Sequence, residues 1–218
     1  MKTDSERIVD NFITKYGREK TELLLSYLDM VLERNEHINL TAVRDRDEAI
    51  VKHLADSLAV TDLPEYRKAG SVIDVGTGAG FPGALLAIVS PEKEFCLLDS
   101  TLKRLRVIDE FANTLGLSNI RTVHARAEEI NRKPEYSGSL DLCVSRAVAS
   151  LDKLAGWCLP FVKKGGSFIS YKGNSYADEI EGAGNILRRQ GSELLRAEQY
   201  KNAPADIAGH VLLVFSKH

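Results

Sequence analysis

The sequence has few cysteines, a single tryptophan and no long apolar run, and its charges nearly cancel. Among 218 residues there are 3 cysteines and 1 tryptophan, and the formal net charge is −2. Cys96, Cys143 and Cys158 are odd in number, widely spaced and set in apolar stretches, which favours reduced core thiols over disulfides or a zinc site. No apolar run approaches transmembrane length, and the charged start at residues 1–7 predicts no signal peptide.

The near-neutral charge also argues against a uniformly basic surface. With 29 Lys and Arg against 31 Asp and Glu, any nucleic-acid site must be a local patch. A hydrophobic content of 44% with 28% charged residues is ordinary for a globular protein and argues against disorder. The length allows one domain with an extension. We expect a compact cytoplasmic protein and a monomer.

The chain is organised around residues 72–83, where a short buried strand runs into a glycine-rich turn. Gly76, Gly78 and Gly80 accept positive φ and have no Cβ, so the main chain can approach a ligand closely. The spacing differs from the dinucleotide pattern G-x-G-x-x-G, because Phe81 stands where that pattern needs its third glycine. A tight strand-to-helix turn without a ligand is the alternative interpretation.

A second strand is expected at residues 94–98, and an acid follows it directly. That acid is Asp99, which lies 19 residues after Gly80 (99 − 80). A carboxylate at that strand end is placed to accept hydrogen bonds from both hydroxyls of a ribose. Glycine turn and acid together indicate a cofactor that carries a nucleoside.

The first sixty residues and the remainder differ in pattern. We expect a helix capped by Asp4 or Ser5 and ending at Tyr16, a second helix from Thr21, and one or two more ending near Val60. Residues 1–62 therefore form a helical cap, and residues 64–70 are a short linker. Over residues 70–218 strands and helices alternate, among them a helix at 102–115 that Gly116 ends and strands at 120–124 and 166–171, which predicts an α/β domain with a mostly parallel sheet. Strands at 193–200 and 210–216 are close enough for a hairpin, so the last strand is antiparallel.

The turn resembles motif I of the class I S-adenosylmethionine methyltransferases, which share a Rossmann-like sheet with an antiparallel last strand. The wider set of motifs resembles the RsmG family, also called GidB, over nearly the whole chain. Those motifs are Asn39-Leu40-Thr41-Ala42, His53-Leu54-Ala55-Asp56-Ser57-Leu58, residues 74–83, Leu97-Leu98-Asp99-Ser100, Ala125-Arg126-Ala127-Glu128-Glu129, Ser145-Arg146-Ala147 and Lys172-Gly173. The chain departs from the family pattern at Val148, where Phe is common, and at Ala84-Leu85, where a second proline often follows Gly83.

The resemblance implies an enzyme that methylates N7 of a guanine in the 16S RNA of the small ribosomal subunit, with S-adenosylmethionine as cofactor. The residues expected to bind this cofactor are Asp74, Gly76, Gly78, Gly80, Phe81, Asp99, Ser100, Ala127, Glu128 and Arg146. Ala127 and Glu128 would meet the adenine, although an acid in a first helical turn is also a common surface feature. Arg146 is costly at a strand end unless paired, and its partner is left open between the cofactor carboxylate, a nearby acid and the RNA backbone.

Guanine N7 carries no proton, so we expect no catalytic base and no metal, and a rate that depends on alignment. Candidate RNA contacts are basic residues near strand ends, for each of which a solvated surface charge is the alternative. They are Arg44, Arg46, Lys52, His53, Lys103, Arg104, Arg106, Arg126, Lys163, Lys164 and Lys172. His53 and Asp56 are alternatively a buried pair that joins the cap to the sheet, and Phe81 and Tyr171 are candidate stacking platforms or core residues. A methyltransferase acting on a small molecule or protein, or a nucleoside-binding module without activity, remains the alternative function.

Overall fold

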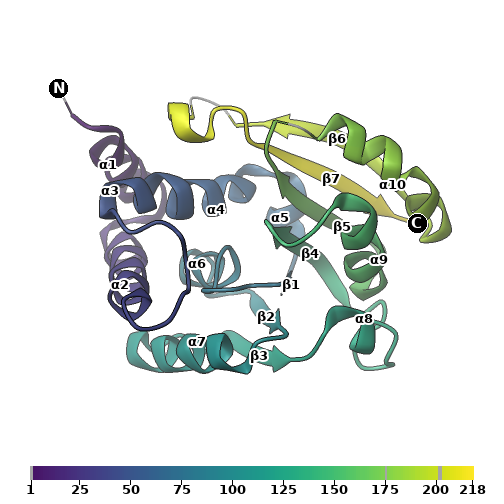
Figure 1. Ribbon diagram of the computed structural model, residues 1–218, viewed down its shortest axis with the longest axis horizontal. Coiled ribbons are helices and arrows are strands. Elements are labelled where there is room, and N and C mark those ends of the chain that lie inside the picture. Colours follow the sequence, from purple (N-terminus) through teal and green to yellow (C-terminus); the bar gives the residue numbers. More distant parts are fainter. Residues whose placement is uncertain (1, 175, 201–202) are drawn as a thin grey trace.

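A computed structural model of the protein describes residues 2–174, 176–200 and 203–218. Its strands are β1 (Ser71–Val75), β2 (Glu94–Asp99), β3 (Ile120–His124), β4 (Leu140–Arg146), β5 (Val162–Lys172), β6 (Ser192–Gln199) and β7 (Val211–Lys217). They form one sheet in the order β3-β2-β1-β4-β5-β7-β6 (Figure 1). Strands β1 to β5 pair in parallel, whereas β7 is antiparallel to both β5 and β6. This arrangement confirms the predicted fold class and the predicted final hairpin.

The chain begins with a helical region that lies at the left in Figure 1 and extends, in its blue part, across the upper middle of the view. Its elements are α1 (Asp4–Tyr16), α2 (Arg18–Asn35), α3 (Arg46–Ala49), the π-helix η1 (Ile50–Ala55), α4 (Asp56–Leu58) and the 3-10 helix η2 (Ala59–Asp62). The cap of α1 is Thr3, which accepts from the Glu6 N–H and forms a capping box, so the expected Asp4 or Ser5 cap is one or two residues late. Gly17, with φ of 87°, ends the helix as expected.

The helices that alternate with the strands follow the predicted βαβ pattern. They are α5 (Pro64–Lys68), α6 (Gly83–Val89), α7 (Leu102–Leu115), α8 (Ala127–Ile130), α9 (Leu151–Cys158), η3 (Leu159–Phe161), α10 (Ala177–Arg189) and η4 (Ala205–Ile207). Helix α7 matches its predicted bounds because its buried residues recur at helical spacing and Gly116 adopts the left-handed conformation that ends it. The predicted linker at 64–70 is instead largely helix α5, in which Pro64 fills the first turn and Tyr66 is buried.

Each face of the sheet is covered, because alternate side chains of a strand point to opposite sides. Val72 belongs to the apolar cluster that contains Leu24 and Leu28 of α2, so the cap packs on the face that α6 and α7 also cover. Ile73 belongs to the opposite cluster, with Leu154 of α9. The carboxyl ends of β1 to β4 are left free between these layers, and this is the edge where open parallel sheets bind ligands.

Two expectations from composition are tested by the structure. All three cysteines are free and buried, which confirms the prediction of core thiols. Over the described part of the chain, no helix is long and apolar enough to cross a membrane.

Candidate active site

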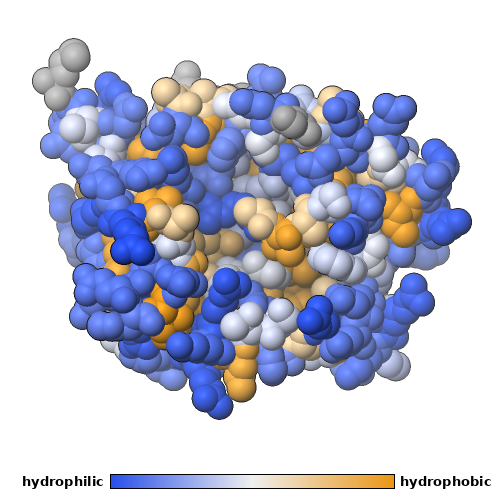
Figure 2. Space-filling view, viewed as in Figure 1, coloured by the Kyte–Doolittle hydropathy of each residue, from blue (hydrophilic) through white to orange (hydrophobic). Residues whose placement is uncertain are grey.

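A cavity of about 480 Å³ opens at the carboxyl ends of β1, β2 and β4, beside the loop that follows β3. The space-filling view shows this face of the molecule hollowed near its centre, inside a hydrophilic rim (Figure 2). The residues predicted to bind the cofactor that line the cavity are Gly76, Gly78, Phe81, Asp99, Ser100, Ala127, Glu128 and Arg146. The structure therefore brings together residues from four strand ends.

The turn after β1 takes the conformation that its glycines permit. Gly76, Gly78 and Gly80 have φ of 75°, 59° and 90°, values that side-chain-bearing residues avoid. The Gly76 N–H donates to the Leu98 carbonyl at 2.8 Å, which ties the start of the turn to β2. A Cβ at Gly78 would meet no atom within 4 Å. The turn is thus anchored at its base and open at Gly78, which lines the cavity.

Asp99 is the acid at the end of β2; it lies against the turn and lines the cavity. Its Oδ2 accepts from the Gly78 N–H at 3.0 Å, and its Oδ1 accepts from the Thr101 N–H at 2.8 Å. The Arg104 guanidinium is 3.9 Å from Oδ2. Each oxygen keeps further acceptor capacity, since an ionised carboxylate accepts about four hydrogen bonds. Asp99 therefore shapes the turn and still presents an acceptor at the cavity edge.

Asp74 and Gly80 were expected to bind the cofactor, but the structure assigns them elsewhere and they do not line the cavity. Asp74 is fully buried and accepts from the Gly83 N–H at 2.9 Å, which fixes the start of α6. Burial raises the pKa of Asp74 to about 6, against the lowering effect of that hydrogen bond. Gly80 makes room for Tyr27 of α2, because a Cβ there would overlap the tyrosine hydroxyl.

The residues expected to meet the adenine, after β3, lie at the start of α8. Ala127 is buried, Glu128 is exposed, and both line the cavity. As the first residues of a helix, they have N–H groups without an acceptor inside that helix. This edge therefore offers main-chain donors beside a carboxylate.

Arg146, the last residue of β4, has a nearby acid as its partner, one of the three alternatives left open by the sequence. Its Nη1 donates to Asp56 Oδ2 at 2.7 Å and to the Lys52 carbonyl at 3.0 Å. The guanidinium carbon also lies 5.7 Å from the centre of the Phe81 ring. The arginine therefore joins the cap to the sheet while it lines the cavity.

His53 is not a free cation. Its ring stacks on Phe81 with centroids 4.7 Å apart, and its Nε2 is hydrogen bonded to Thr41 Oγ1 at 2.7 Å. Burial, with the Arg146 charge in support, lowers the pKa of His53 to about 4, so the ring is neutral near pH 7. We withdraw His53 as a phosphate contact. The predicted pair of His53 with Asp56 is also replaced, because Asp56 bonds to Arg146 instead.

The two aromatic candidates are core residues. Tyr171 is buried and its hydroxyl donates to the Ser57 carbonyl at 2.7 Å. Phe81 is 6% exposed and lies under His53. Neither ring offers an open face for a base, so the core interpretation holds for both.

Several basic candidates are held inside the fold or on the wrong edge. Lys172 is 10% exposed and its Nζ bonds to Glu179 at 2.6 Å and to the Ala149 carbonyl, so it is withdrawn as an RNA contact. Lys163 pairs with Asp141 near the amino end of β5, and Lys164 follows it, at the sheet edge opposite the cavity. Lys163 and Lys164 are therefore too far from the cavity to contact a nucleotide bound in it.

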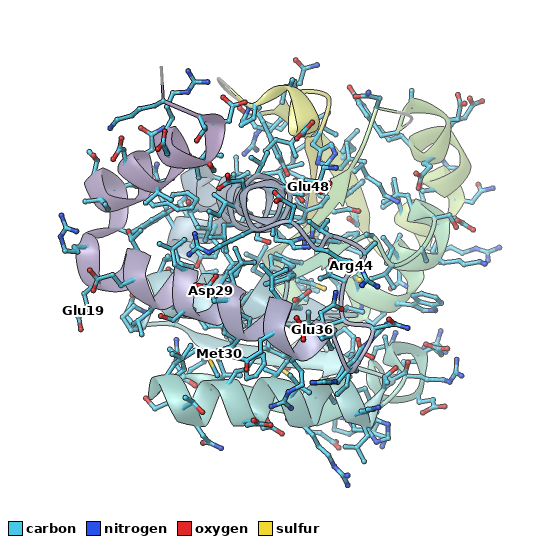
Figure 3. The ribbon with its side chains drawn as sticks, turned by 60° about the vertical axis from the view of Figure 1, so that its left-hand side comes forward. Glu19, Asp29, Met30, Glu36, Arg44 and Glu48 are labelled. Carbon is cyan, nitrogen blue, oxygen red and sulfur yellow. The ribbon has the colours of Figure 1, made fainter. Side chains whose placement is uncertain are left out.

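The cap contributes few unpaired cations. Arg46 makes two hydrogen bonds to Asp29, at 2.6 and 3.1 Å, and Lys52 pairs with Glu48 at 2.5 Å. Figure 3 shows that acids are frequent on this side of the molecule: it labels Asp29 on α2 together with Glu19, Glu36 and Glu48. Arg44, also labelled, lies on the loop after α2. Arg44, Lys103, Arg106 and Arg126 are exposed and form no ion pair with any residue that the structure describes. They are the candidates best placed to meet a polyanion.

Sequence reasoning missed part of the cavity wall. Leu40 and Thr41 of the cap line it, as do Val148 and Trp157. Thr41 belongs to the motif Asn39-Leu40-Thr41-Ala42, which could have indicated that it lies at the site. No local sequence pattern marks Trp157 as a cavity residue. Ala147 has φ of 55°, a left-handed conformation at a non-glycine residue beside the site.

The sheet order, the glycine turn and the acid one strand away define this protein as a class I S-adenosylmethionine-dependent methyltransferase. Solved structures share the fold. A SAM dependent methyltransferase from Aquifex aeolicus has a TM-score of 0.55 at 19% identity, covering 77% of this chain and 94% of that one. TYW2 from M. jannaschii in complex with AdoMet has a TM-score of 0.53 at 19% identity, covering 78% of each chain.

The particular family follows from sequence. The family model GidB, described as rRNA small subunit methyltransferase G, matches residues 20–206. A ribosomal RNA small subunit methyltransferase G from Clostridium perfringens is 36% identical over 209 residues, covering 96% of this chain and 87% of the relative. One from Alkaliphilus metalliredigens is 41% identical over 198 residues, covering 91% and 82%. The chain belongs to the GidB family, as its motifs predicted.

Proposed function

We propose that this protein transfers the methyl group of S-adenosylmethionine to N7 of a guanine in the 16S RNA of the small ribosomal subunit. Family membership supports the reaction and the class of acceptor. The observation that carries the proposal is the cavity itself, where the glycine turn, Asp99 and Arg146 meet at one sheet edge.

The strand order supports one direction for the bound donor. Along the edge the sequence of strands is β3, β2, β1, β4. Glu128 follows β3 and Asp99 ends β2, so the adenine and the ribose lie over these two strands. The turn at Gly76 and Gly78 follows β1 and receives the methionine part. The acceptor base then approaches from the side of β4 and the cap, where Thr41, His53 and Arg146 line the same cavity.

The residues present fit this donor. The open space beside Gly78 is room that any side chain would fill. The Asp99 carboxylate offers acceptors for ribose hydroxyls, and the N–H groups at the start of α8 offer donors to the adenine edge. When bound, the donor supplies an electrophilic methyl group on a sulfonium sulfur.

For this reaction the protein must align the reacting atoms, and it does not need to transfer a proton. The N7 lone pair forms the new bond to the methyl carbon as the carbon–sulfur bond breaks, and the positive charge passes from sulfur to the base. No proton is lost from N7, so no general base is required. Holding the three atoms in line is worth roughly 7–11 kcal/mol when the geometry is near-ideal. The turn and Asp99 supply this for the donor.

The RNA contacts are proposed at Arg44, Lys103, Arg104, Arg106 and Arg126, which are exposed or line the cavity. Arg104 and Arg126 line it directly, and Lys103 is exposed beside Arg104 on α7. Arg46 and Lys52 remain weaker candidates, because acids already neutralise them. We further propose that residues 1–62 act as a cap on a methyltransferase domain of residues 70–218. The protein would work in the cytoplasm as a monomer, on the assembled or assembling small subunit.

Transfer of a radioactive methyl group tests the function. Small subunits from cells that lack this methyltransferase are incubated with purified protein and labelled donor, and the RNA is digested and mapped. The proposal predicts label in one N7-methylguanine of the small-subunit RNA. A parallel incubation uses a cell extract in place of the subunits. Label in a ribosomal protein or in a protein or small molecule of that extract instead of the RNA, or donor binding without transfer, would contradict the proposal and support the corresponding alternative.

A further inference from the structure

Asp56 of α4 is a buried carboxylate on which three parts of the chain converge. Its Oδ2 accepts from Arg146 Nη1 at 2.7 Å, at the end of β4. Its Oδ1 accepts from the Tyr200 hydroxyl at 2.8 Å and is 2.9 Å from His210 Nδ1. Tyr200 follows β6 and His210 precedes β7, so both come from the C-terminal hairpin. The Asp56 side chain is 5% exposed, and both of its oxygens are in use.

This arrangement holds one edge of the Arg146 guanidinium and leaves the other edge free. Nη1 is bound by Asp56 and by the Lys52 carbonyl. Nε and Nη2 donate to no residue within the described ranges, and the side chain lines the cavity. Because the guanidinium is planar, fixing Nη1 fixes the plane in which the free N–H groups lie. Asp56 therefore fixes the orientation of two donor nitrogens, Nε and Nη2 of Arg146, at the end of β4.

Charge gives Asp56 a second effect on the reaction. The donor is a cation, and methylation leaves a positive charge on the base. An unpaired arginine at the acceptor end of the cavity would repel the donor cation and the positive charge that forms on the base, since charges interact strongly where water is excluded. The Asp56 carboxylate cancels the Arg146 charge at 2.7 Å, while His53, which stacks on Phe81, is neutral.

We propose that Asp56 is a positioning residue for methyl transfer, which directs Arg146 toward the acceptor base and neutralises it, and that Tyr200 and His210 hold Asp56 in turn. The proposal rests on the function proposed above. It does not make Asp56 a contact of donor or RNA. It requires that the effect of Asp56 pass through Arg146.

A double-mutant cycle tests that requirement. Asp56→Asn removes the charge in a side chain of nearly the same shape. We expect kcat for subunit methylation to fall by about 100-fold, the loss that misplacing a reacting group by about 1 Å can produce. The KM for subunits and the Kd for donor should change by less than about twofold, because binding of neither ligand depends directly on Asp56. In an Arg146→Gln background, Asp56→Asn should lower kcat hardly further.

Two additional variants keep the test decisive. Tyr200→Phe removes one hydroxyl from the Asp56 carboxylate and should lower kcat by about fivefold, again only when Arg146 is present. Lys93→Met is the matched control, because Lys93 is a buried charge near the start of β2, bonded to the Ala69 carbonyl at the opposite sheet edge. It should lower the free energy of unfolding and leave kcat unchanged.

The outcomes separate the two proposals. Independent, multiplying losses from Asp56→Asn and Arg146→Gln would overturn the positioning role, and so would a loss confined to the free energy of unfolding. If Asp56→Asn does not fold, the cycle with Tyr200→Phe decides by the same criterion. A parent protein that binds donor and methylates no RNA would overturn the proposed function, and the positioning role with it.

Discussion

The hydroxyl of Tyr27, on cap helix α2, donates a hydrogen bond of 2.9 Å to the carbonyl oxygen of Ala79 in the glycine turn. Tyr27 is fully buried and packs edge-on against Phe81 and Phe111. The turn proposed to receive the donor is thus supported from behind by a residue 52 positions earlier in the chain. A helix of the N-terminal region therefore helps to build the proposed donor site.

Replacing Tyr27 with Phe should therefore loosen the turn. The Ala79 carbonyl loses its buried partner, which costs about 1–3 kcal/mol in the free energy of unfolding, and donor affinity should fall as well. Denaturant unfolding and calorimetric titration with donor measure the two effects. Tyr16→Phe is the control, because Tyr16 bonds to Thr61 away from the turn. Donor affinity equal to that of the parent in Tyr27→Phe would show that the cap does not support the site.

The glycines of the turn should differ in what they tolerate. Both Gly78 and Gly80 have positive φ, so alanine at either position costs roughly 1–2 kcal/mol in the backbone. Gly80→Ala also forces Tyr27 aside, whereas a Cβ at Gly78 enters open space at the cavity. We expect Gly80→Ala to lose more stability and Gly78→Ala to lose donor affinity with a milder loss of stability.

A second substitution separates the clash from the backbone cost at Gly80. Tyr27→Phe removes the hydroxyl that the new Cβ would overlap. In the Gly80→Ala background it should restore part of the free energy of unfolding, although it lowers that energy in the parent. Additive losses, measured by denaturant unfolding of all three variants, would show that Tyr27 does not set the requirement for glycine.

Asp74 should make stability fall as pH rises through the acidic range. Its usual pKa is 3.8 and burial raises the folded value to about 6, so between these values the folded state holds more protons than the unfolded state. The raised pKa therefore stabilises the folded state at pH values below this window. Up to about 3 kcal/mol of the free energy of unfolding is lost as the pH rises through it. Asp74→Asn keeps an oxygen for the Gly83 N–H and has no proton to lose. Unfolding free energies at pH 4 and pH 7 should drop more in the parent than in Asp74→Asn, and equal drops would refute the shifted pKa.

The exposed cations of α7 should account for part of RNA affinity. Lys103→Glu with Arg106→Glu leaves the cavity lining intact and should weaken binding to small-subunit RNA, with the slope of log affinity against log salt reduced by about 1 per lost phosphate contact. The matched control is Lys163→Glu with Lys164→Glu, at the opposite sheet edge. Filter binding at several salt concentrations distinguishes the pairs, and equal slopes in both would remove α7 from the RNA interface.

Much of the fold could be predicted because its signals are local. Helix α7 and strand β3 have their predicted bounds, since apolar spacing and Gly116 mark them directly. Strand β5 starts at Val162, four residues before the predicted Gly166, because the glycines at 165 and 166 concealed a strand whose pairing with β4 is irregular. The segment from Arg46 to Asp62 contains a π-helix, for which no sequence pattern was available.

The site was predictable to the extent that parallel strands bring their carboxyl ends together. That rule placed Gly76, Asp99 and Glu128 in one cavity. It could not say which way Asp74 points, and alternation along β1 turns this carboxylate into the core. Nor could it join Asp56 to Arg146, because the two are separated by 90 positions and meet only through the packing of the cap.

A crystal structure of the protein with S-adenosylmethionine bound tests the central claim most directly. The account predicts the ribose hydroxyls at the Asp99 carboxylate, the adenine over the start of α8, and the sulfonium methyl beside the turn at Gly76 and Gly78, directed toward the side of the cavity with Thr41 and Arg146. Donor density that lies outside this cavity, or that lies in it with adenine and methionine exchanged, would contradict the account.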